Sequence, residues 1–124
     1  MNGEALRVDG PRDITGATVL TSRLQMTAEH WPGGVPPMTR HFRSSLAWRM
    51  SLVAAGRFDS MLTFRDCFEW DIAAGTLIAR EAGIHVSDGQ GGAPRYNSPG
   101  AMVPGLIAAP ARLHAQIMNY RRPD

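Results

Sequence analysis

Apolar residues recur at helical spacing in two segments of the chain. The segments span residues 45–55 and 71–82, where apolar side chains three and four positions apart share one face of a helix. Gly56 and Gly83 follow them, and glycine readily adopts the left-handed conformation that ends a helix. The pattern predicts two helices at these positions, and a further helix is expected over residues 111–120.

The helix predicted over residues 71–82 has the best-defined orientation. Side chains at helical spacing form one face, which is expected to pack on the rest of the domain. These residues are Ala74, Leu77, Ile78, Glu81 and Ala82.

Short segments rich in β-branched and aromatic residues predict strands between and before the helices. Glycine and proline make residues 31–37 a loop and residues 88–92 a turn. The predicted strands span residues 5–8, 17–22, 58–64, 84–87 and 106–109. Alternating strands and helices predict a layered α/β domain, a sheet flanked by helices, over residues 1–124 as one domain.

The composition excludes several classes of protein. The chain is 44% hydrophobic and 19% charged, as in an average globular domain. Its net charge of +2 is too small for the strongly basic surface of a nucleic-acid binder. Cys67 is the sole cysteine, so an internal disulfide is impossible. Neither a membrane-spanning run nor a signal peptide is evident, and we expect a cytoplasmic protein.

Asp71 is the residue whose position best suits chemistry. A carboxylate in the first turn of a helix faces the positive end of the helix dipole, which keeps it ionised. Such an oxygen ligand suits a hard cation such as magnesium (Mg2+). The alternative is that Asp71 only caps its helix, since aspartate is among the commonest capping residues.

The other residue types that commonly bind metals show no suitable spacing. The chain has four histidines, far apart in sequence, and Cys67 has no partner motif. We assign neither a metal nor a nucleophile to them. The glycines of residues 89–92 are too few, and a strand is expected after them, so this segment is a turn and not a phosphate loop.

Residues 70–75 and 80–83 resemble the second signature of the inositol monophosphatase superfamily. Residues 44–59 resemble the helix and strand that precede this signature, and the match runs in order from residue 42 to residue 109. The resemblance implies the carboxyl-terminal half of the family's αβαβα fold and a magnesium-dependent phosphatase.

Within this superfamily, residues 69–71, 95–97 and 105–109 look most like bacterial 3'(2'),5'-bisphosphate nucleotidases. That resemblance implies a small phosphate ester as substrate, namely adenosine 3',5'-bisphosphate, which is hydrolysed to AMP and phosphate. An inositol monophosphatase or a related sugar phosphatase is the alternative.

The resemblance also implies roles for individual residues. Asp71 matches a carboxylate that binds a catalytic metal and lies beside the substrate, and no further catalytic residue is implied. Ser44 and Ser45 match substrate-facing positions at the head of a helix, although Ser44 replaces the usual glycine. Arg49 matches a lysine of the nucleotidases and would bind phosphate, and Arg65 would also face the substrate. For both arginines, an ordinary surface role is the alternative.

The family's first signature, which supplies further metal-binding carboxylates, is missing from these 124 residues. Residues 2–3 resemble the hairpin that follows it. We therefore expect this chain to be incomplete as an enzyme and to need a companion amino-terminal half, with a homo-oligomer as the other candidate assembly. The competing hypothesis is a non-enzymatic remnant that serves as an interaction module.

Overall fold

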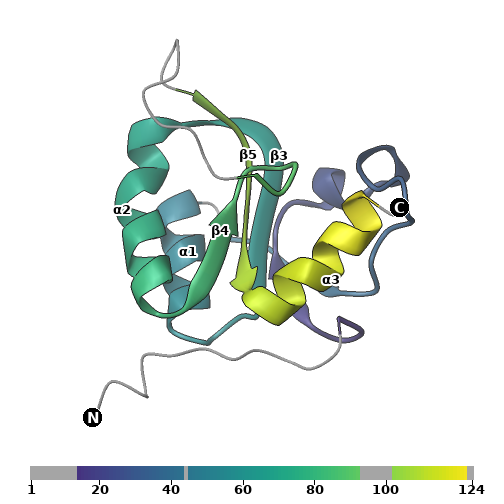
Figure 1. Ribbon diagram of the computed structural model, residues 1–124, viewed down its shortest axis with the longest axis horizontal. Helices are drawn as coiled ribbons and strands as arrows, with labels where there is room; N and C mark the ends of the chain where they lie inside the picture. The colour runs from purple at the N-terminus through teal and green to yellow at the C-terminus, as the bar shows by residue number, and fades with distance from the viewer. Residues whose placement is uncertain (1–13, 44, 93–101, 123–124) are drawn as a thin grey trace.

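The computed structural model describes residues 14–43, 45–92 and 102–122 of the chain. Figure 1 shows a central sheet with helices on both faces. The strands are β1 (Thr18–Leu20), β2 (Thr39–His41), β3 (Ser60–Phe68), β4 (Ile84–Ser87) and β5 (Met102–Pro110). The helices are α1 (Leu46–Ala54), α2 (Glu69–Glu81), α3 (Ala111–Arg121) and the short 3-10 helices η2 (Arg23–Met26) and η3 (Ala28–His30).

The sheet is mixed, and its last strand lies inside it. The strand order is β2-β1-β3-β5-β4. The β1 strand is parallel to both β2 and β3, whereas β5 is antiparallel to both β3 and β4. In Figure 1, α1 and α2 cover one face of the sheet, and α3 lies on the other. No helix in the described part of the chain is long and apolar enough to cross a membrane.

Two apolar clusters hold these layers together, one on each face of the sheet. Successive strand residues point to opposite faces, so Met61 belongs to the cluster beneath α1 and α2, and Leu62 belongs to the cluster beneath α3. Leu106 and Ile107 divide in the same way. Both faces are therefore buried, which explains the continuous apolar run of residues 106–109 in β5.

The predicted elements are largely confirmed, with longer central strands. The α/β layer architecture and the three helices are present, and Gly83 has a φ of 88°, as the end of α2 requires. The β3 strand continues to Phe68, and β5 begins at Met102. The short strand β2 and the two 3-10 helices were not predicted. The strand expected over residues 5–8 lies outside the described residues.

The predicted packing face of α2 is confirmed for Ala82, which is buried, but is wrong for Leu77, Ile78 and Glu81, which are exposed. Leu77 and Ile78 are 62% and 50% exposed, whereas Ala79 is buried against the sheet. The reason is a close approach of α1, because a Cβ atom on Gly75 would lie 3.0 Å from the sulfur of Met50. Such an approach requires small residues on the inward face, so the larger ones point outward.

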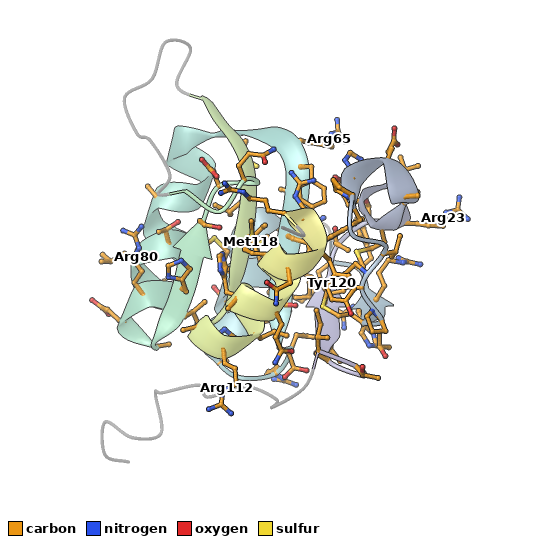
Figure 2. The ribbon with its side chains drawn as sticks, turned by 45° about the vertical axis from the view of Figure 1, so that its right-hand side comes forward. Arg23, Arg65, Arg80, Arg112, Met118 and Tyr120 are labelled. Carbon is orange, nitrogen blue, oxygen red and sulfur yellow. The ribbon has the colours of Figure 1, made fainter. Side chains whose placement is uncertain are left out.

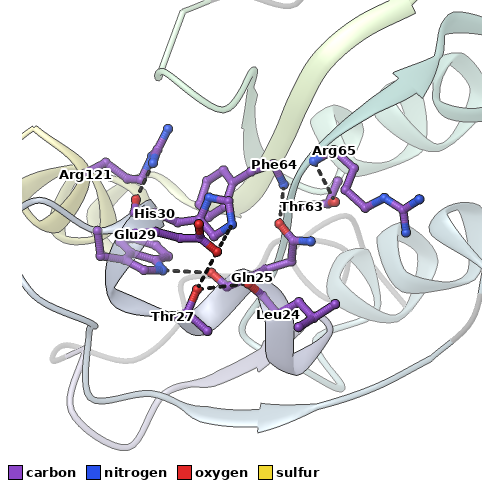
Figure 3. A network of polar contacts seen from close by, with 10 residues as sticks. Leu24, Gln25, Thr27, Glu29, His30, Thr63, Phe64, Arg65 and Arg121 are labelled. Atoms are coloured by element: carbon purple, nitrogen blue, oxygen red, sulfur yellow. Dashed lines mark hydrogen bonds and ion pairs between the residues drawn. The ribbon is translucent and has the colours of Figure 1, made fainter.

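A network of polar contacts fastens the segment before α1 to the end of the chain (Figure 3). Arg121 donates from Nε to the Gly89 carbonyl at 3.0 Å and from a terminal nitrogen to the His30 carbonyl. Its guanidinium also lies 4.1 Å from the centre of the Phe64 ring. The Phe64 N–H donates to the Gln25 side chain at 2.9 Å. This network joins β3, α3 and the 3-10 helices.

His114 is buried against β4, where the neutral form of its ring is favoured. Its Nε2 and the Ser87 hydroxyl share a hydrogen bond of 2.7 Å, and its ring centre lies 4.3 Å from that of His85. Burial, with a smaller contribution from His85, lowers the pKa of His114 to about 4. Protonation of His114 is therefore unfavourable in the folded state.

We expect this histidine to make the fold sensitive to acid. Its pKa rises to about 6.5 on unfolding, so its contribution to stability is complete above that pH and is lost as the pH falls toward 4. The loss should reach about 1 to 2 kcal/mol. Urea unfolding at pH 7 and pH 4.5 measures it, and His114→Gln should reduce the difference. An unchanged pH dependence in that variant would contradict the assignment.

Candidate functional site

Ser45 begins α1 as its N-cap. Its side-chain oxygen accepts a hydrogen bond from the Trp48 N–H at 3.3 Å, which satisfies one of the free amides of the first helical turn. The hydroxyl is exposed and lies at the positive end of the helix. Ser45 thus caps the helix that the sequence predicts over residues 45–55, whereas its contact with a substrate stays a prediction. Ser44 lies outside the described residues.

Arg49 is buried, with only 8% of its surface exposed. Its Nε donates to the Arg43 carbonyl, and its guanidinium lies 5.0 Å from the centre of the Phe42 ring. Burial lowers the pKa of Arg49, and the nearby Cys67 opposes that shift. The alternative of a solvated surface arginine is therefore wrong for Arg49. Its contact with a phosphate stays a prediction.

Asp71 lies in the first turn of α2, as predicted, because the helix begins at Glu69 directly after β3. Arg49 interacts electrostatically with Cys67, near the end of β3 and four positions before Asp71. The first half of α1 therefore lies beside the junction of β3 and α2. One turn after Asp71, α2 also approaches α1, since a Cβ atom on Gly75 would lie 3.0 Å from the sulfur of Met50.

Among the described residues, no contact joins Arg65 to Ser45 or Arg49. It is exposed on β3, where its backbone N–H donates to the Thr63 hydroxyl at 3.3 Å. Figure 3 shows its side chain extending away from the Gln25 network, and Figure 2 shows it at the surface. Its predicted substrate contact stays a prediction.

The described side chains do not form a metal site. No group of three or more histidine, cysteine, aspartate or glutamate side chains gathers within residues 14–43, 45–92 and 102–122 where these side chains are described. A magnesium ion prefers about six oxygen ligands. The described side chains therefore do not fit this ion without carboxylates from elsewhere.

The contact between His85 and His114 was not predicted, because they lie on different elements and far apart in sequence. The alternation of apolar and polar residues in β4 could have indicated the direction of the His85 side chain, which is exposed between buried Ile84 and Val86. His114 faces the sheet from α3. The two rings form a packing contact, and no third metal-binding side chain joins them among the described ones.

A mixed sheet with two helices on one face and a third on the other defines a layered α/β domain. The family model described as the inositol monophosphatase family matches residues 1–123. The chain belongs to this family, a phosphatase family whose members act on small phosphate esters and generally depend on magnesium.

Three known proteins illustrate the relationship. The chain is 36% identical to Nus factor SuhB of Pasteurella multocida over 99% of its own length and 47% of the relative. The staphylococcal enzyme SaIMPase-II, solved with inositol monophosphate bound, has a TM-score of 0.78 at 19% identity over 94% of this chain and 45% of that one. CysQ from Bacteroides thetaiotaomicron has a TM-score of 0.62 at 27% identity over 85% and 40%. The chain spans about half the length of the curated relatives it matches.

Proposed function

We propose that this chain supplies one half of a magnesium-dependent phosphatase whose substrate is adenosine 3',5'-bisphosphate. The observation that carries the proposal is the position of Asp71 in the first turn of α2, within a chain that matches the family model almost throughout. In this proposal Asp71 is a metal ligand, and Ser44, Ser45, Arg49 and Arg65 face the substrate. Magnesium is the cofactor, and the cytoplasm is the compartment.

The choice of substrate rests on residues 69–71, 95–97 and 105–109, whose pattern resembles the bisphosphate nucleotidases. Of the last two segments, only residues 105–109 are described, and they lie within β5. An inositol monophosphate is the second candidate. It is favoured by a relative named inositol-1-monophosphatase from Rhizobium meliloti, which is 33% identical over 74% of this chain and 37% of its own length. The alternative to an enzyme is a non-enzymatic role, which we retain because several relatives are named Nus factor SuhB.

The need for a companion half is supported by the outer surface of α1 and α2. Leu77 and Ile78 are exposed there and point outward. A groove of about 260 Å³ runs between the helices and is lined mainly by apolar atoms of Ala54, Ala82 and Ile78. Such a surface is typical of an interaction site. The occupant in this proposal is the remaining half of the family fold, in the same polypeptide or a separate one.

The test is a reconstitution. We expect negligible phosphate release from adenosine 3',5'-bisphosphate by this chain alone, and magnesium-dependent release after addition of the amino-terminal half of a family member. Metal-assisted hydrolysis needs convergent carboxylates, which this chain does not supply by itself. Inositol 1-phosphate, assayed in parallel, distinguishes the two substrates.

Association of the halves is measured separately by analytical ultracentrifugation. Leu77→Glu should weaken it, because the charge would be buried in the contact. The matched control is Leu24→Glu, which changes a leucine that is 67% exposed on η2, away from α2. Equal association of both variants would refute the docking surface, whereas association without hydrolysis would refute the enzymatic proposal alone.

A further inference from the structure

A polar cleft lies on the solvent side of α1, beside the candidate site. It has a volume of about 330 Å³ and is lined by Arg43, Trp48, Leu52, Arg57 and Phe58. Trp48 and Leu52 are one helical turn apart on α1, and the other three residues come from the segments on either side of that helix. Its size lies within the range of small-molecule sites.

One wall of the cleft holds a positioned guanidinium. Arg43 lies between two aromatic rings, 6.0 Å from the ring centre of Trp48 and 5.3 Å from that of Phe58. It donates one hydrogen bond, at 2.7 Å, to the Phe42 carbonyl. Because an arginine has five N–H donors, this arrangement fixes the side chain and leaves donors for a ligand.

The charge of the cleft is not neutralised by its surroundings. Arg57 is exposed, and within the described residues neither Arg43 nor Arg57 forms an ion pair. No acidic residue lines the cleft. Asp59, the acidic residue nearest in sequence, is turned toward β1 instead, where its carboxylate accepts hydrogen bonds from the backbone N–H and the hydroxyl of Thr18 at 2.7 and 3.0 Å. Among the described side chains, no carboxylate therefore serves as a counter-ion to the two guanidinium groups.

The cleft adjoins the candidate site, because Arg49 donates from Nε to the Arg43 carbonyl and Ser45 accepts a hydrogen bond from the Trp48 N–H. Arg49, one residue after Trp48, is buried and interacts with Cys67 at the end of β3. Trp48 is half exposed. A ligand in the cleft would thus contact Trp48 without replacing the hydrogen bond of Arg49.

We propose that this cleft binds a nucleoside monophosphate. The phosphate accepts charge-assisted hydrogen bonds from Arg43 and Arg57, since guanidinium groups match phosphate oxygens in pairs. The base stacks on the exposed face of Trp48 or against Phe58, because aromatic side chains bind any base through its π-face. The residues that line the cleft are not those proposed to bind the metal or the substrate, so binding here can be measured without phosphatase activity.

The test uses the whole chain and the fluorescence of Trp48. Addition of AMP should quench tryptophan emission with saturation, and Trp48→Phe should remove most of this change. Adenosine, which lacks the phosphate, should bind about tenfold more weakly, and inorganic phosphate should compete with AMP. Calorimetry with the Trp48→Phe variant separates loss of the signal from loss of binding.

The arginine variants decide the proposal. Arg57→Gln and the Arg43→Gln, Arg57→Gln double variant should raise the midpoint for AMP, by about tenfold in the double variant. Arg80→Gln is the matched control, because Arg80 is an exposed arginine of α2 outside the cleft (Figure 2). Circular dichroism checks the fold, and Arg57→Gln alone suffices if the double variant unfolds, because its side chain is exposed. An absence of saturable quenching in the millimolar range, or equal midpoints in Arg57→Gln and Arg80→Gln, would overturn the proposal.

Discussion

Asp71→Asn should abolish phosphate release in the reconstituted enzyme, with a loss of about 100-fold or more in kcat. The amide keeps the shape of the side chain but removes the negative charge that a magnesium ion requires. Folding should be little affected, since the lost interaction with the helix dipole is worth only about 0.3 to 1 kcal/mol. Steady-state kinetics with and without magnesium measure the loss, and circular dichroism verifies the fold.

Glu29→Gln is the matched control for Asp71→Asn. It makes the same change from carboxylate to amide at an exposed residue of η3, far along the chain from α2. Its turnover should equal that of the unmodified enzyme. If Asp71→Asn retained full magnesium-dependent turnover, the role proposed for Asp71 would be wrong, even if the reconstituted enzyme were active.

Gly105→Ala should destabilise the fold by about 3 kcal/mol or more. Gly105 lies in β5 with a φ of 81°, a conformation that side chains rarely adopt. A Cβ atom there would lie 3.0 Å from the Thr63 carbonyl oxygen and 3.1 Å from the Cα of Gly89. Both neighbours are backbone atoms, so the added methyl group could be accommodated only by moving the sheet. Denaturant unfolding measures the change.

Gly16→Ala separates the effect of the positive φ from that of close packing. Gly16 has nearly the same φ, 82°, but a Cβ atom on it would meet nothing within 4 Å. Its variant should therefore lose only the conformational contribution, about 1 to 2 kcal/mol. If the two variants lost equal stability, close packing around Gly105 would not be the cause.

The sequence predicted most of the elements because local signals and the buried pattern agree in them. Ser45 caps α1, and Gly83 ends α2, so both helix boundaries could be placed from single residues. The length of β3 could not be predicted, because the register of its pairing with β5 shifts between Thr63 and Asp66. Such an irregularity depends on the partner strand and leaves no local pattern.

The candidate site was less accessible to prediction than the fold. The position of Asp71 in a first helical turn followed from the sequence, but the burial of Arg49 did not, because it depends on the contact between α1 and β3. The outward direction of Leu77 was also missed, since an apolar residue on a helix is ordinarily assigned to the core. Arg43 and Arg57 each adjoin a phenylalanine in sequence, which was the only local signal of their cleft.

The interior position of β5 determines the order in which a nascent chain can fold. The ribosome completes β3 at Phe68, but the strand that pairs with its free edge begins only at Met102. At about 5 to 20 residues per second, β3 leaves synthesis roughly 2 to 7 s before its neighbour, with one edge unpaired. During that interval β4 also lacks β5, the strand with which it pairs in the described sheet. Translation speed and chaperones should therefore act on this chain chiefly between β3 and β5, when an open strand edge is available for aggregation.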